Sequence, residues 1–136
     1  MCVLGWLAAL STYDIRERRL PNWLSLPGAV VIMIAAIATG HGAQAMLGGA
    51  ALFIVYLAVH LSAPCALGAG DVKLAIGLGA LTGAFGADVW SLAAAGAPLL
   101  TAGFAIAAYV WRAESSVPHG PSMCLATAAA VGLTVV

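Results

Sequence analysis

The chain has 136 residues and zero formal net charge; 63% of its residues are hydrophobic and 7% are charged. A soluble domain carries roughly a quarter charged residues, and a domain of this size has too little interior to bury so many apolar side chains. The composition therefore excludes an ordinary soluble domain. It predicts one all-α domain over residues 1–136, a polytopic membrane bundle of about six spanning helices. The lipid bilayer is an expected partner, whereas nucleic acid is not, because no net positive charge is present to attract phosphates.

The expected membrane spans, in chain order, are 1–13, 23–39, 46–64, 72–87, 90–111 and 121–136. A helix that crosses the hydrocarbon core needs about 20 apolar residues, with a range of about 17–25. The first expected span is short and looks truncated, and the fourth is short and rich in glycine. Small residues recur at four-residue spacing in the fourth span, which predicts that another helix approaches it closely. They are Ala75, Gly79, Gly83 and Ala87.

The basic residues indicate how these spans are oriented. All 5 Lys and Arg residues fall in or beside the first, third and fifth connections between spans, namely Arg16, Arg18, Arg19, Lys73 and Arg112. Short loops rich in Lys and Arg stay in the cytoplasm. The pattern therefore predicts that these connections face the cytoplasm and that both ends of the chain lie on the outer side.

Two acidic residues lie near the expected hydrocarbon region, where an ionisable group is energetically costly and is therefore a candidate functional residue. Asp14 ends the first expected span and Asp71 begins the fourth, so both are expected at the cytoplasmic membrane boundary. Each also has a purely structural interpretation: Asp71 as a helix N-cap, and Asp14 as the point where the chain leaves the membrane. We expect the remaining acids, Glu17, Asp88 and Glu114, to be solvated loop residues.

Together, the two aspartates suggest a catalytic pair. Two carboxyls held close together do not both ionise easily, so one keeps a proton while the other stays charged. Such a pair activates water for peptide hydrolysis, because the carboxylate takes a proton from water and the neutral acid bonds the scissile carbonyl. Glycines before Asp71 would let a substrate backbone approach, since they carry no Cβ.

Three segments carry a family resemblance. "GAGDVK" (68–73) matches a G-x-G-D-x-K motif, and "DIRERRLPN" (14–22) has an aspartate followed six residues later by Leu-Pro-Asn. "VPHGPSM" (117–123) contains a Pro-x-Gly-Pro segment. In this order they resemble the signatures of the type IV prepilin peptidases, apart from Leu20, where those enzymes usually have isoleucine.

The resemblance implies a membrane aspartic endopeptidase that removes the short basic leader from prepilins or pseudopilins at the cytoplasmic face of the bacterial inner membrane. It implies Asp14 and Asp71 as the catalytic pair. We expect no cofactor and no metal. The resemblance also implies a set of motif or substrate-site residues, which are Gly68, Gly70, Lys73, Pro21, Asn22, Gly120 and Pro121. The role of Lys73 stays open between steadying the pair, contacting the substrate and lying at the membrane interface.

The larger family members carry a cytoplasmic segment with paired cysteines and methylate the new N-terminus. The 3 cysteines here, Cys2, Cys65 and Cys124, are far apart and form no C-x-x-C pair, so they suggest neither a zinc site nor a disulfide framework. The chain resembles the small peptidase-only type of tight-adherence (Flp) pilus systems, and no methyltransferase activity is expected. An archaeal preflagellin peptidase is a close relative that also fits.

Two other classes of function stay open on the residues alone. A small proton-coupled transporter or a non-catalytic assembly subunit could also use Asp14 and Asp71, although a transporter usually places its carboxylates near mid-membrane. A zinc peptidase would need histidines at helical spacing near a carboxylate, as in H-E-x-x-H. The histidines here, His41, His60 and His119, are scattered and show no such pattern.

Overall fold

The structure, a computed structural model, describes residues 2–111 and 118–135, and these residues form helices and short connections without strands. The helices are α1 (Cys2–Glu17), α2 (Asn22–Ala38), α3 (Gly42–Ser62), α4 (Ala69–Ala84), α5 (Ala87–Val110) and α6 (Gly120–Val135). Each expected span corresponds to one of these helices, which confirms the predicted helical bundle. By length and composition, α3 and α5 are long and apolar enough to cross a membrane, whereas α2 and α6 are shorter apolar helices.

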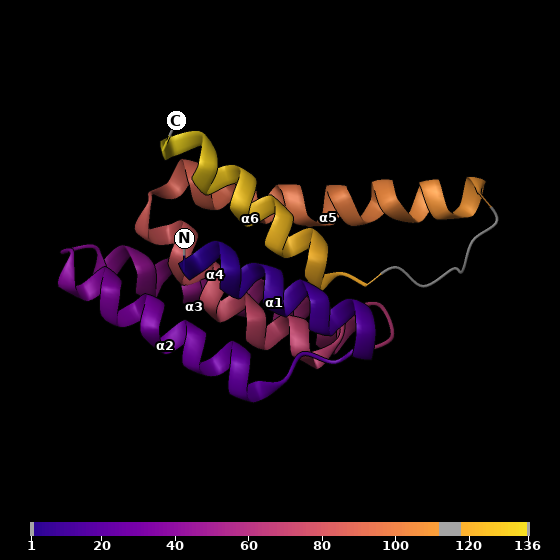
Figure 1. Ribbon diagram of the computed structural model, residues 1–136, viewed down its shortest axis with the longest axis horizontal. Helices are drawn as coiled ribbons and strands as arrows, with labels where there is room; N and C mark the ends of the chain where they lie inside the picture. Colours follow the sequence, from indigo (N-terminus) through magenta and orange to yellow (C-terminus); the bar gives the residue numbers. More distant parts are fainter. Residues whose placement is uncertain (1, 112–117, 136) are drawn as a thin grey trace.

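The helices run back and forth, with α4 at the centre of the bundle (Figure 1). Helix α4 contacts α2, α3, α5 and α6, and α6 packs on α5 and α1. The connections α1–α2 and α3–α4 lie at one end of the bundle, where α5 ends and α6 begins (Figure 1). The connections α2–α3 and α4–α5 lie at the other end. We call the first of these the dyad end, because it contains both Asp14 and Asp71.

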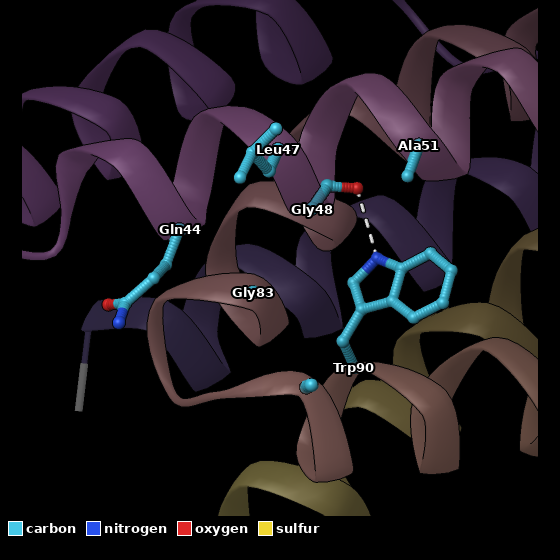
Figure 2. Close-up of a pocket in the computed structure, with 7 residues that line it drawn as sticks. Gln44, Leu47, Gly48, Ala51, Gly83 and Trp90 are labelled. Carbon is cyan, nitrogen blue, oxygen red and sulfur yellow. Dashed lines mark hydrogen bonds between the residues drawn. The ribbon is translucent and has the colours of Figure 1, made fainter.

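Helices α3 and α4 meet through glycines, which confirms the predicted close approach. A Cβ at Gly83 would lie 2.7 Å from the carbonyl oxygen of Gln44 and 2.9 Å from the Cα of Gly48. The indole Nε1 of Trp90 in α5 donates a hydrogen bond of 3.0 Å to the carbonyl of Gly48, as Figure 2 shows. These residues line a small pocket of about 260 Å³ at the end of the bundle opposite the dyad end.

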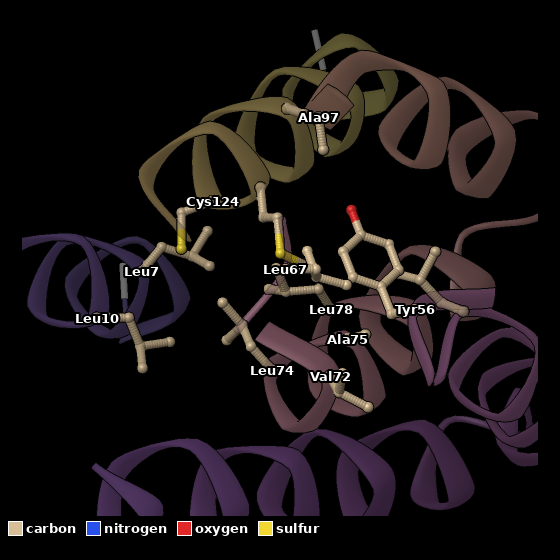
Figure 3. Close-up of a cluster of buried hydrophobic side chains, with 13 residues drawn as sticks. Leu7, Leu10, Tyr56, Leu67, Val72, Leu74, Ala75, Leu78, Ala97 and Cys124 are labelled. Atoms are coloured by element: carbon tan, nitrogen blue, oxygen red, sulfur yellow. The ribbon is translucent and has the colours of Figure 1, made fainter. Parts of the chain in front are cut away.

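The main apolar core lies between α1, α4 and α6, with Tyr56 of α3 at its edge (Figure 3). Its fully buried side chains include Leu10, Leu74, Leu78 and Met123. Leu10 is one helical turn before Asp14, and Leu74 is one turn after Asp71. The same packing that buries these leucines therefore fixes the last turns of α1 beside the first turn of α4.

The structure corrects several expected boundaries. Asp14 does not end its helix, because α1 continues to Glu17. Asp88 lies in the first turn of α5 and not in a loop; an acid there is favoured by the positive end of the helix dipole. The connection before it is short and turns at Gly86, whose φ of 118° requires glycine. Arg112 and Glu114, both expected in the fifth connection, lie outside the described residues.

Candidate active site

Asp14 is buried near the end of α1 and is hydrogen-bonded to the beginning of α6. The backbone N–H of Gly120 donates a hydrogen bond of 3.1 Å to its Oδ2. A Cβ at residue 120 would lie 2.5 Å from the same oxygen, so this contact requires glycine. The Pro-x-Gly-Pro segment therefore acts on Asp14 through a backbone amide, and a carboxylate at the N-terminus of a helix is electrostatically favoured.

Asp71 is buried in the first turn of α4, three residues after the N-cap, Gly68. Its backbone N–H bonds the Gly68 carbonyl at 3.1 Å, and its carboxylate accepts a hydrogen bond from the Gly68 backbone. An acidic residue at this position that reaches back to the N-cap amide resembles half of a capping box. Asp71 is thus part of the helix start without being the N-cap itself.

Both carboxyls line one pocket of about 330 Å³ at the dyad end. Its lining comes from α1, the α1–α2 connection, the start of α2 and the start of α4, and comprises Asp14, Arg18, Arg19, Leu20, Asn22, Gly68, Ala69, Gly70, Asp71 and Lys73. The structure therefore brings together two of the three segments that carried the resemblance. The third segment reaches the site through the Gly120 amide.

Both aspartates lie just outside the expected apolar spans 1–13 and 72–87, and burial raises the pKa of each. For Asp14, the hydrogen bond from Gly120 opposes that rise in the pKa. For Asp71, burial and then the negative charge of Asp14 raise the pKa to about 6, against the opposing hydrogen bond from Gly68. The two groups therefore sense each other, and Asp71 holds its proton to a higher pH than an ordinary carboxyl does.

The remaining motif residues connect the walls of this pocket. The Nζ of Lys73 donates a hydrogen bond of 3.0 Å to the Oδ1 of Asn22, which joins α4 to the start of α2. Pro21 is the N-cap of α2, and its carbonyl accepts the amide of Ser25 at 3.2 Å. A Cβ at Gly70 would lie 3.2 Å from the Cβ of Leu20, so Gly70 lets the α1–α2 connection pack on α4. Pro121 follows Gly120 in the first turn of α6, where proline is well tolerated.

Sequence reasoning missed a polar cluster beside the pocket. The ring of His119 contacts the hydroxyl of Tyr56 through Nε2 at 3.1 Å and that of Thr101 through Nδ1 at 2.6 Å. His60 bonds the carbonyl of Leu67 through Nδ1 at 2.6 Å, next to the N-cap of α4. Tyr56 and Thr101 belong to no motif, so the sequence gives no signal for them. Their partner His119 lies within the Pro-x-Gly-Pro segment, which was the available clue.

Comparison with known proteins agrees with this geometry. A family model described as "Type IV leader peptidase family" matches residues 1–111, which is most of the chain and includes both aspartates. Searches of curated proteins and of solved structures found no match. The match supports a leader-peptidase activity in general and an inner-membrane location. With the buried carboxyls, the glycine-lined pocket and the extent of that match in view, the chain belongs to the type IV leader peptidase family.

Proposed function

We propose that this protein is a membrane aspartic endopeptidase that removes the leader peptide from type IV, Flp-like prepilins, with Asp14 and Asp71 as its catalytic pair. One observation carries the proposal. Two buried carboxyls from α1 and α4 line the same pocket. Asp14 accepts a hydrogen bond from the backbone of Gly120, and Asp71 accepts one from the backbone of Gly68. Carboxyls used only to cap or end helices would not need a shared pocket.

The two carboxyls have different environments, and this difference supports different roles. The Gly120 amide stabilises the charged form of Asp14, so Asp14 is the general base. Asp71 keeps its proton more readily and is the general acid. Asp14 accepts a proton from water as the oxygen attacks the scissile carbonyl, while Asp71 donates a hydrogen bond to the carbonyl oxygen. Breakdown of the tetrahedral intermediate passes the proton held by Asp14 to the leaving amine and regenerates the pair.

The pocket is suited to an extended peptide. Gly68, Ala69 and Gly70 line it with little or no side chain, which leaves room for a substrate backbone beside Asp71. The pocket lies at the end of the bundle, so a substrate whose apolar helix is in the bilayer would present the junction before that helix. This placement fits cleavage at the membrane boundary, which we assign to the cytoplasmic face of the bacterial inner membrane.

The protein as proposed is a single integral membrane domain, residues 1–136, that cleaves without methylating its product. We expect the mature pilin to carry a free, unmethylated amine when this chain is the only enzyme added. The intact mass of the product from purified components tests this point, and a mass increase of one methyl group would contradict it.

The function itself is tested by co-expression with a candidate prepilin and measurement of its N-terminal mass. Asp14→Asn and Asp71→Asn keep size and most hydrogen bonding but remove proton exchange. Each should lower cleavage by more than about 100-fold, with membrane abundance near wild type. The double variant should be no worse than either single variant, as for groups that act as one unit.

Asp88→Asn, an exposed acid in α5, is the matched control. Substantial cleavage by either dyad variant would reject the aspartic mechanism.

A further inference from the structure

The hydrogen bonds around His119 specify which ring nitrogen carries the proton. The Oγ1 of Thr101 lies 3.0 Å from the Ala97 carbonyl and donates its single proton there. The same oxygen lies 2.6 Å from Nδ1 of His119, so it must accept from that nitrogen. Burial lowers the pKa of His119, which precedes the expected span 121–136, and this favours the neutral ring. The ring is therefore protonated at Nδ1, and Nε2 accepts from the Tyr56 hydroxyl at 3.1 Å.

These hydrogen bonds join three elements at His119, the residue before Gly120. Tyr56 is in α3, Thr101 is in α5, and His119 immediately precedes α6. The His119 carbonyl also accepts the amide of Met123 at 3.1 Å, which closes the first turn of α6. The direction of the Gly120 N–H therefore depends on His119. Its side chain is hydrogen-bonded on both sides, and its carbonyl is hydrogen-bonded within α6.

We propose that His119 is a positioning residue, which holds the turn that presents the Gly120 amide to Asp14. This inference rests on the proposed function of Asp14. His119 does not line the pocket that contains the two aspartates; it lines a neighbouring pocket of about 410 Å³ with Tyr56 and Thr101. It acts on the site through the backbone and not by contact with the reacting atoms.

The substitution Thr101→Val tests the proposal, because valine keeps the shape of threonine but removes the acceptor for Nδ1. We expect kcat to fall about tenfold, since a small misplacement of a catalytic group is costly, and KM to stay within about twofold. Thr101→Ser keeps the hydroxyl and should restore most of the lost kcat. Thr39→Val is the matched control: Thr39 makes the same bond to the carbonyl four residues earlier, at 3.0 Å, but at the opposite end of the bundle.

A second measurement does not depend on activity. The imidazole ¹⁵N chemical shifts of the purified protein should show a neutral Nδ1–H ring for His119, identified by loss of its signal in His119→Gln. Thr101→Val should shift this ring toward the Nε2–H form. An Nε2–H ring in the wild-type protein would overturn the proposal.

Equal kcat in Thr101→Val and the wild type, with the wild type active, would also overturn the positioning role and leave the peptidase function intact. A wild-type protein that cleaves no prepilin would reject the proposed function, and the positioning role with it, even where the Nδ1–H ring is observed.

Discussion

Asp14 and Asp71 reach the same pocket through opposite kinds of helix end. Asp14 lies near the C-terminal end of α1, which is electrostatically unfavourable for a negative charge, and the amide at the start of α6 compensates. Asp71 lies in the first turn of its own helix, where a negative charge is favoured. Removal of the Gly120 contact should therefore impair Asp14 more than any comparable change would impair Asp71.

The pH dependence of cleavage follows from the two carboxyls. The proposed mechanism requires Asp71 protonated and Asp14 ionised. If it holds, kcat/KM should fall as the pH rises through the pKa of Asp71, which burial and Asp14 raise to about 6. It should fall again at low pH as Asp14 takes up a proton. Initial rates on a prepilin peptide across the pH range check this. A rate that stays constant from pH 5 to pH 8, from about one unit below that pKa to about two units above it, would contradict it. Glu17→Gln, an exposed neighbour, should leave the profile unchanged.

Gly120→Ala should lower cleavage by about 10- to 100-fold, because its Cβ would meet Asp14 Oδ2 at 2.5 Å and push the carboxylate or the amide out of place. The same helix provides a matched control, since nothing lies within 4 Å of a Cβ at Gly132. Gly132→Ala should keep full activity. The test is to compare kcat of the two variants at equal membrane abundance. Equal activities would mean that Gly120 serves the backbone turn alone.

The residues of the site were predictable to the extent that motifs mark them. Asp14, Asp71 and the glycines beside Asp71 could be named from the sequence because their type and order are unusual in an apolar chain. That Gly70 packs on Leu20 could not, since it depends on how the α1–α2 connection folds back. Nor could the partnership of His119 with Tyr56 and Thr101, which joins positions far apart in the sequence.

At the scale of elements, α3 and α4 pack closely because glycines occur on both helices. Ala75, Gly79 and Gly83 form the stripe on α4, whereas Ala87, expected in the same stripe, begins α5. The four-residue spacing predicted a close neighbour without saying which helix it would be. The structure identifies α3, through Gly48 and Gly49. Helix boundaries were less predictable, because apolar length alone does not show where capping interactions begin. Helix α4 starts at Ala69, three residues before its apolar run, since Gly68 and Asp71 form its first turn.

Gly79→Ala should destabilise the bundle. A Cβ at this position would lie 2.8 Å from the Cβ of Leu52 and 3.0 Å from the Cα of Gly49, so α3 and α4 would have to separate. We expect the free energy of unfolding to fall by about 1–3 kcal/mol, the usual cost of overpacking.

Gly103→Ala in α5 is the matched control, because nothing lies within 4 Å of its Cβ position. It should be neutral or stabilising by up to about 1 kcal/mol, since alanine is the better helix former. Thermal unfolding of both variants in detergent compares them, and a destabilisation equal in size for the two would reject the packing argument.

At the scale of the molecule, the distribution of charge gives the bundle two unlike ends. Arg16, Arg18, Arg19 and Lys73 all lie at the dyad end, within or next to the pocket. The opposite end carries Asp88 and no Lys or Arg among the residues that the structure describes. Because short loops rich in Lys and Arg stay in the cytoplasm, we expect the basic end to face inward. The proposed active site would then lie on the side where prepilins are made.

The native cysteines provide a test of this orientation without any reporter fusion. Cys2 is exposed at the start of α1, and Cys65 is exposed in the α3–α4 connection at the dyad end, whereas Cys124 is buried. Because α1 runs from one end of the bundle to the other, Cys2 and Cys65 should lie on opposite sides of the membrane.

We expect a membrane-impermeant maleimide added to intact spheroplasts to label Cys65→Ser, which keeps Cys2, and not Cys2→Ser, which keeps Cys65. In inverted vesicles the pattern should reverse, and Cys124 should react only after denaturation because its thiol is inside the core. Labelling of Cys65 from outside would place Asp14 and Asp71 on the wrong face for a cytoplasmic leader, and the proposed substrate would have to be abandoned even if the pair hydrolyses peptides.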